Sequence, residues 1–157
     1  MRWAAFAQER PDLAAEGQRL LYQFGLGLGF LATVAKDGSP RVHPMCPMFF
    51  EGGLYAFIEP GPKRGDLVRD GRYALHCYPP PQNEDAFYVT GRAILVEDAS
   101  LRARIEPEWA AERKLDEAPP QLARNLLFEL DVERCLVTKA ARGDWEPQHT
   151  VWHAADR

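Results

Sequence analysis

The sequence predicts a mainly β (α+β) fold in which antiparallel strands close, or nearly close, into a barrel with short flanking helices. Three observations predict it. Apolar runs of strand length recur along the chain, turn signals rich in Gly, Pro and Asp separate them, and helical patterns are few and short. The most organised stretch, residues 30–78, predicts four strands with a short helix before the last of them.

Length and charge predict one globular domain over residues 1–157. A chain of 157 residues buries about 70% of its unfolded surface, which is enough for one core. The net charge of −4 disfavours a protein that coats nucleic acid or anionic lipid, so any phosphate site has to be local. The N-terminal residues lack the apolar core of a signal peptide and no apolar run approaches about 18 residues, so we expect a cytoplasmic protein.

Cysteine and histidine spacing predicts no metal site. Cys46, Cys77 and Cys135 lie far apart without a CxxC pair, which fits reduced, buried thiols. His149 and His153 stand four residues apart, as on one helical face. This is a weak metal signal without a further ligand, and we interpret both as part of a solvated face.

The N-terminal region predicts a helix followed by a linker. Residues 11–24 are amphipathic, with Pro11 in the first turn and Leu20 and Leu21 near helical spacing to Leu13. The glycines of residues 25–30 follow this helix and open a strand, and they lack the GxGxxG spacing of a dinucleotide site. They are therefore interpreted as a linker into the sheet.

The barrel, over about residues 30–140, begins with a hairpin that contains three prolines. Residues 30–35 form the first strand, an Asp-Gly turn follows, and residues 41–50 return antiparallel. Pro40, Pro44 and Pro47 fall in or next to the return. Because proline cannot donate to a ladder, this strand has to be an edge, bulged, or open to a ligand on one side.

Three elements complete the first half of the barrel. Residues 54–59 and 73–78 are predicted strands, and residues 63–71 between them are a short helix. In this helix Leu67 and Val68 are expected to face inward, and Gly71 to be a left-handed C-cap.

The second half predicts two long strands around a helix. Residues 87–97 form a strand with Gly91 at a bulge or close approach. Residues 100–114 are helical and broken at Pro107, with Ser100 or Asp98 as cap, and residues 126–140 form the last strand. The tail, residues 141–157, is polar but holds two tryptophans, which suggests that it docks onto something.

Basic residues at the start of the short helix predict an anion site. Lys63 and Arg64 follow a Pro-Gly-Pro turn, where free N–H groups and the helix dipole already favour a phosphate, and Arg41 can join them. Two or three charge-assisted hydrogen bonds of about 1.5 to 3 kcal/mol each outweigh the weak unfavourable field of the whole chain. The alternative is that these side chains are solvated surface charges.

The chain resembles the pyridoxamine 5′-phosphate oxidase-like superfamily, the FMN-binding split barrels. The resemblance covers residues 30–138, and it rests on FLATVAKDGSPRVHPM, LYAFIEPGPKRGDLVRDGRYALHCY and FYVTGRAILVED. Arg41 matches the family's phosphate-binding Arg after the first hairpin. Lys63, followed by Leu67, Gly71, Tyr73 and Leu75, then matches the family's phosphate-binding segment without a gap.

The resemblance implies a six-stranded antiparallel split β-barrel that binds FMN between the two subunits of a homodimer. It implies that Arg41 and Lys63, with Arg64 displaced beside them, hold the phosphate. The remaining implied contacts are the backbone of Val42, His43, Pro44 and Met45 along the flavin ring, Phe57 and Ile58 beside it, and Trp145 or Trp152 as a cover. His43 could also donate a proton, with a structural role as the alternative.

Departures from the family pattern argue against oxidation of pyridoxamine phosphate itself. Pro62 precedes Lys63 where the family has a basic residue, and the Gln that contacts the flavin before Gly91 is missing. The C-terminal Trp and Arg constellation that grips the substrate is not recognisable either. We therefore expect an FMN-dependent oxidoreductase acting on an unidentified small molecule. The alternatives are an F420-dependent reductase of the same fold, a haem- or flavin-binding protein without turnover, and a barrel that has lost its cofactor.

Overall fold

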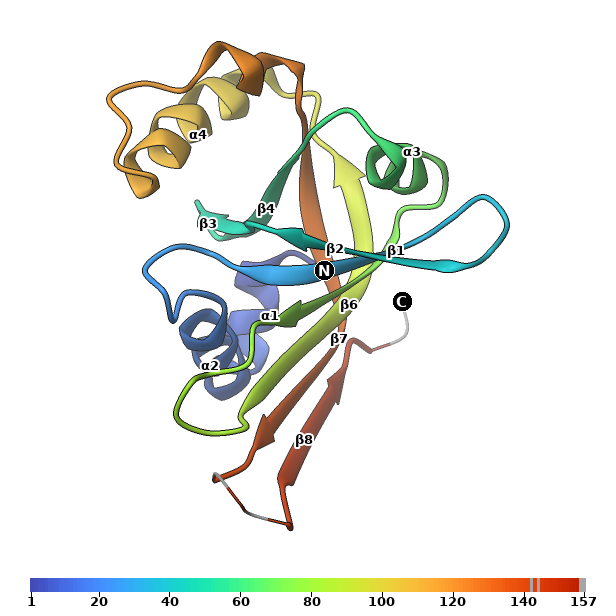
Figure 1. Cartoon of the computed structure of the whole chain (residues 1–157), viewed down its shortest axis with the longest axis vertical. Helices are drawn as coiled ribbons and strands as arrows, with labels where there is room; N and C mark the ends of the chain where they lie inside the picture. Colours follow the sequence, from blue (N-terminus) through green and yellow to red (C-terminus); the bar gives the residue numbers. More distant parts are fainter. Residues whose placement is uncertain (142, 144, 156–157) are drawn as a thin grey trace.

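The computed structural model describes residues 1–141, 143 and 145–155, and its sheet curls into a split barrel (Figure 1). The helices are α1 (Trp3–Glu9), α2 (Pro11–Leu21), α3 (Pro62–Arg69), α4 (Ala99–Glu112) and the 3₁₀ helix η1 (Pro120–Arg124). The strands are β1 (Gly29–Val34), β2 (Pro40–Met45), β3 (Met48–Phe50), β4 (Gly53–Ile58), β5 (Arg72–Cys77), β6 (Ala86–Leu95), β7 (Leu126–Lys139) and β8 (Gln148–His153).

All strand pairs are antiparallel, in the order β2-β1-β5-β6-β7-β4-β3. The two ends of this path, β2 and β3, follow one another in the chain. The predicted strand over residues 41–50 is therefore two strands: the first half pairs with β1, and after Cys46 and Pro47 the second half pairs with β4. Pro47, which has no N–H to donate, lies at this corner of the barrel.

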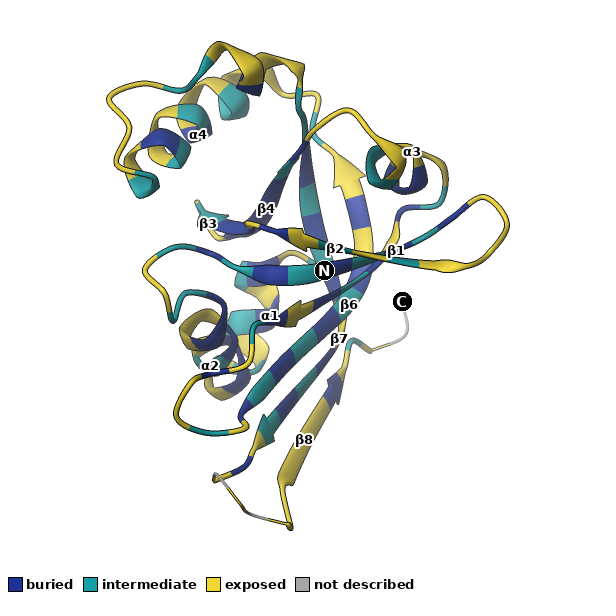
Figure 2. Ribbon diagram, in the orientation of Figure 1, coloured by how far each residue is buried: buried dark blue, intermediate teal, exposed yellow. Residues whose placement is uncertain are grey.

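The expectation of six strands was wrong, because the proline corner divides one strand and the tail supplies another. Residues 148–153 form β8, which pairs with Arg134–Lys139 of β7 and lies at the far end of the sheet from α4 (Figure 1). Five of its six residues are exposed, and Trp152 is the buried one (Figure 2). Because it is an edge strand with little buried surface, its sequence is polar. His149 and His153 are thus on a strand, about 13 Å apart at 3.3 Å per residue.

The helices depart from prediction at three points. The predicted helix over residues 11–24 ends at Leu21, and the short helix α1 precedes it, burying Trp3 and Phe6. Helix α4 runs through Pro107 without a break. Pro107 is exposed, so the carbonyl that loses its partner there can turn to water. Asp98 caps α4 by accepting from the backbone N–H groups of Ser100 and Leu101 at 2.8 and 3.1 Å.

Two predicted glycine roles are confirmed. The register of β6 on β7 shifts between Thr90 and Gly91, and a Cβ at Gly91 would lie 1.8 Å from the carbonyl oxygen of Asp131, so only glycine fits the bulge. Gly71 follows α3 with a φ of +77°, as expected of a left-handed C-cap.

Two apolar clusters hold the fold together. The larger one lies inside the barrel and is closed by α1 and α2; Phe6, Leu20, Phe87, Phe128 and Trp152 belong to it. The smaller one, Met48, Tyr55, Ile105 and Leu127, attaches α4 to the opposite side of β4. Among the described residues, no helix is long and apolar enough to cross a membrane.

Candidate cofactor site

The candidate site is built around Asp66, a carboxylate of α3 that the sequence analysis did not single out. Its side chain is buried, and it accepts hydrogen bonds from Thr33 Oγ1 at 2.9 Å and Arg41 Nε at 2.9 Å, with Arg69 Nη1 at 3.3 Å from its other oxygen. Burial alone would raise the pKa of Asp66, but the hydrogen bonds from Arg41, Thr33 and Arg69 outweigh it and hold that pKa below its usual range. Asp66 therefore ties β1 and β2 to α3.

Arg41 is positioned by this contact. It is on the inner side of β2, opposite Thr33 of β1, and only its Nε is engaged by Asp66. Its terminal nitrogens have no hydrogen bond with any residue that the structure describes. A guanidinium that is fixed at Nε and open at both Nη atoms is suited to a bidentate contact with a phosphate.

Lys63 lies in the first turn of α3, one turn before Asp66 and so on the same helix face. Its Nζ donates to Glu59 Oε1 at 2.8 Å, and its side chain is only 13% exposed. The hydrogen bond and charge of Lys63 hold the pKa of Glu59 below its usual range. Because Arg41 contacts Asp66 and Lys63 lies one turn before Asp66, both cations lie where β2 meets α3, and His43 follows two residues after Arg41 on the same side of β2.

His43 supplies the observation that tests whether these residues fit a bound group. It lies on β2 opposite Leu31, and its Nε2 atom is shielded from solvent without a hydrogen-bond partner among the described residues. Buried polar atoms are normally satisfied. A ligand with a polar edge along β2 would give Nε2 its missing partner, so the residues fit a polar, anionic cofactor.

The other residues of β2 and β4 that the resemblance selects face different ways. Val42 is 61% exposed and Pro44 is exposed on the outer side of β2, whereas Met45 is buried. Ile58 is fully buried in the barrel core. Phe57 faces α4, where its ring has an edge contact with Trp109 at 6.1 Å between centroids and Arg102 5.4 Å over its face.

Arg64 and the two tail tryptophans are not among the hydrogen-bond partners of Asp66 that the structure describes. Arg64 Nη1 donates to the backbone carbonyl of Arg124 at 3.0 Å, which directs it toward the segment before β7. Trp152 is buried in the core, 4.8 Å from Phe6 between ring centroids, with Nε1 donating to Glu9 at 2.9 Å. Trp145 is 94% exposed. The structure therefore groups Arg41, His43 and Lys63, and leaves Arg64 and the tryptophans apart.

The inward face of α3 differs from the predicted one, and this is why the sequence did not indicate Asp66. The short helix was expected to turn Leu67 and Val68 inward, but Leu67 is buried, Val68 is 59% exposed and Asp66 takes the second inward place. A carboxylate within KRGDLVRD has the sequence context of a solvated charge. Only its partners on β1 and β2, which are distant in sequence, show its role.

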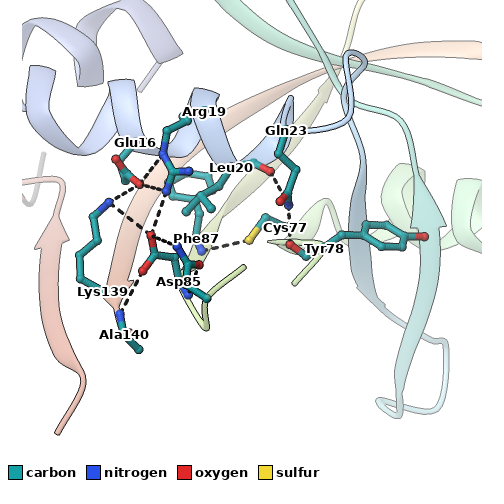
Figure 3. A network of polar contacts seen from close by, with 11 residues as sticks. Glu16, Arg19, Leu20, Gln23, Cys77, Tyr78, Asp85, Phe87, Lys139 and Ala140 are labelled. Atoms are coloured by element: carbon teal, nitrogen blue, oxygen red, sulfur yellow. Dashed lines mark hydrogen bonds and ion pairs between the residues drawn. The ribbon is translucent and has the colours of Figure 1, made fainter. Parts of the chain in front are cut away.

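A second charged cluster, which joins α2 to β6 and β7, is structural (Figure 3). Asp85 is buried, pairs with Arg19 at 2.9 Å and Lys139 at 3.5 Å, and accepts from the backbone N–H of Ala140 at 3.0 Å. Glu16 pairs with the same two cations. Because both carboxylates are paired with both cations, the cluster ties α2 to the start of β6 and the end of β7.

The chain is similar in fold to several solved structures and in sequence to one protein family. The search of curated proteins found no match. Among solved structures, an FAD-binding protein from Mesorhizobium loti is 23% identical, with a TM-score of 0.60 over 78% of this chain and 91% of that one. An F420 reductase is 20% identical, with a TM-score of 0.59 over 74% and 94% of the two chains. A heme-binding protein from Mycobacterium smegmatis is 20% identical, with a TM-score of 0.59 over 87% of this chain and 57% of that one.

At these identities the solved structures establish the fold alone. The sequence goes further, because residues 23–139 match the pyridoxamine 5′-phosphate oxidase family. The match spans β1 to β7, with both halves of the Arg41 and Lys63 site inside it. The chain therefore belongs to the pyridoxamine 5′-phosphate oxidase family.

Proposed function

We propose that this chain binds FMN and is an FMN-dependent oxidoreductase that acts on a small molecule. The observation that carries the proposal is the Arg41 guanidinium of β2. Its Nε is held by buried Asp66, which shares a face of α3 with Lys63, and its terminal nitrogens are open among the described residues. Membership of the family and the FAD-binding neighbour support a flavin-type cofactor. The missing Gln before Gly91 supports a substrate other than pyridoxamine phosphate.

In this proposal the protein binds and orients, and the cofactor is the reactive group. FMN supplies the capacity to accept and return a hydride or single electrons. Arg41 and Lys63 hold the phosphate, and Asp66 fixes the direction of Arg41. His43 Nε2, which has no partner among the described residues, would hydrogen-bond a polar group of the bound cofactor, and exposed Trp145 would be available as a cover. Water is excluded on the Ile58 side by the barrel core.

The proposed assembly is a homodimer with the cofactor at the interface. The outer face of β1, β5 and β6 supports it, since Ala32, Ala74 and Thr90 are aligned across these strands and leave a hollow of about 280 Å³. On the adjoining edge strand, Val42 is 61% exposed. A face of small residues beside an exposed apolar one suits close packing against a second copy.

The direct test is the absorbance spectrum of freshly purified protein, followed by FMN titration of the apo protein. We expect a flavin spectrum and saturable FMN binding, with Arg41→Ala and Lys63→Ala each weakening it at least tenfold and the double variant abolishing it. Arg104→Ala is the control, because Arg104 is an exposed cation that pairs with Glu51 on the surface of α4. A colourless wild-type protein that takes up no FMN would refute the proposal.

The second candidate is an F420-dependent reductase, which the F420 reductase among the neighbours favours. Titration of the same apo protein with F420 separates the two, because the preferred cofactor will bind more tightly. The heme-binding protein among the structural neighbours supports a third candidate, which is a haem- or flavin-binding protein without turnover. A haem band in the spectrum of the purified protein would favour it over both.

A further inference from the structure

A pocket of about 420 Å³ lies where β4 ends and β7 begins, between these strands and the segment that carries α4 and η1. Its walls come from three places: Glu59 and Pro60 after β4, Trp109 of α4, and Pro119, Gln121 and Arg124 before β7. It is separate from the Arg41 and Asp66 contact. It nevertheless adjoins the candidate cofactor site, because Glu59 lines it and pairs with Lys63.

The wall before β7 is fixed by two arginines that bind its backbone. Arg102 donates to the carbonyl oxygens of Asn125 at 2.9 Å and Leu122 at 2.8 Å. Arg64 donates to the carbonyl oxygen of Arg124 at 3.0 Å. The segment that forms this wall of the pocket is thus held by side chains of α4 and α3, and the pocket is formed before any ligand enters.

Two side-chain contacts hold the ring of Trp109 in place. The guanidinium of Arg113 lies 3.9 Å over its ring, and Phe57 contacts it edge to face. With Pro119 and Leu122 it gives the pocket a flat, rigid and apolar wall. Aromatic and proline surfaces of this kind favour a planar ring as a ligand.

The charges around the pocket favour an anion. Glu59 is neutralised by Lys63, whereas Arg64 and Arg124 form no ion pair with any residue that the structure describes. Arg124 is exposed and lines the pocket, so its guanidinium is free to bind an incoming carboxylate or phosphate. The amides of Gln121 and Asn125 add neutral hydrogen-bonding groups.

We propose that this pocket binds a planar aromatic ring that carries an anionic group, with the ring against Trp109 and the anion on Arg124. Two sources share this chemistry: a substrate such as an aromatic carboxylate, or the adenylate half of a dinucleotide flavin whose other half occupies the neighbouring site. The second source rests on the proposed function, whereas the pocket and the first source do not, and binding of either probe can be tested without a flavin.

The test is calorimetric titration of the protein, free of flavin, with 2-naphthoate, AMP and the uncharged 2-naphthamide. We expect saturable binding of at least one anionic probe. Arg124→Gln is expected to weaken that binding about tenfold or more while leaving 2-naphthamide unchanged, because it removes one charge-assisted contact. Trp109→Ala is expected to weaken all probes that bind. Arg104→Gln and Phe24→Ala, at exposed positions outside the pocket, are matched controls.

The probes also separate the two sources. Tighter binding of AMP assigns the pocket to a nucleotide, and tighter binding of 2-naphthoate assigns it to a substrate. Absence of saturable binding by the wild-type protein, equal binding of the anions by Arg124→Gln, or preference for 2-naphthamide would each overturn the proposal. Because Trp109→Ala also removes packing, its thermal unfolding is compared with that of the wild type. If Trp109→Ala does not fold, the binding data for Arg124→Gln decide the test alone. Flavin titration of the same variants reports separately on the proposed function.

Discussion

At the scale of single residues, the site depends on a carboxylate that binds no ligand itself. Asp66 is buried and takes three hydrogen bonds, two of them from arginines. Replacing it leaves Thr33 and Arg41 without an acceptor and frees the guanidinium to turn into solvent. Of this pair, Arg41 could be predicted from the sequence, because it matches a family position. Asp66 could not, because Thr33 and Arg41 lie on two other elements that are distant in sequence.

We predict that Asp66→Asn lowers the free energy of unfolding by about 1.5 to 3 kcal/mol at pH 7, the usual contribution of hydrogen bonds to a charged group. The folded pKa of Asp66 lies below the unfolded value of about 4, so its stabilisation is present above that pH and is lost as pH falls through the folded pKa. Urea unfolding between pH 7 and pH 3 measures this. The difference between wild type and variant should shrink toward the acid end; a difference that does not vary with pH would contradict the account.

His43 permits a prediction with opposite signs for stability and binding. Its Nε2 is buried without a partner in the part of the chain that the structure describes, which costs about 1 to 3 kcal/mol in the ligand-free protein. His43→Leu removes the polar atom at similar volume, so we expect the apo protein to keep or gain thermal stability while FMN binding weakens several-fold. Thermal unfolding and FMN titration check the two halves. A variant that loses stability would show that His43 is only a structural residue.

At the scale of elements, the sequence predicts the strands that bury several apolar residues and misses the strand that buries only one. Both β6 and β7 alternate buried and less buried residues, and both were predicted within a few residues. By contrast, β8 buries only Trp152, so no period is visible in its sequence. Helix α1, at seven residues, is too short for a helical period, and the break between β2 and β3 depends on which strand each half meets.

The two tail tryptophans test the role of β8. Trp152 packs against Phe6 and donates to Glu9, whereas Trp145 is 94% exposed. We predict that Trp152→Ala costs about 3 to 5 kcal/mol of unfolding free energy, as for other large-to-small changes in a core, and that Trp145→Ala changes it by less than about 0.5 kcal/mol. Urea unfolding of both variants provides the measurement. Equal effects would mean that β8 does not fasten the tail to the core.

At the scale of the whole molecule, the barrel has one face covered and one open. Helices α1 and α2 close the core on the inner side of the sheet, while the outer sides of β1, β5 and β6 line an open hollow of about 280 Å³. Hydrophobic patterning predicts which residues point away from the core. It does not tell whether those residues meet water or a second chain. If a second chain covers this face, both subunits form the proposed cofactor site; if water covers it, the proposed site lies within one chain.

We therefore predict that Ala74→Arg converts a dimer into a monomer without unfolding it. Ala74 lies between Ala32 and Thr90 at the centre of the hollow, where an arginine fits an open face but not a packed one. Sedimentation equilibrium should give twice the monomer mass for wild type and one monomer mass for Ala74→Arg, with unchanged thermal unfolding of the dissociated chain at low concentration. Leu115→Arg, at an exposed apolar residue away from this face, should remain dimeric. If the cofactor is bound between subunits, Ala74→Arg also loses FMN although Arg41, Asp66 and Lys63 are intact, whereas a monomer that retains full FMN affinity would place the site within one chain.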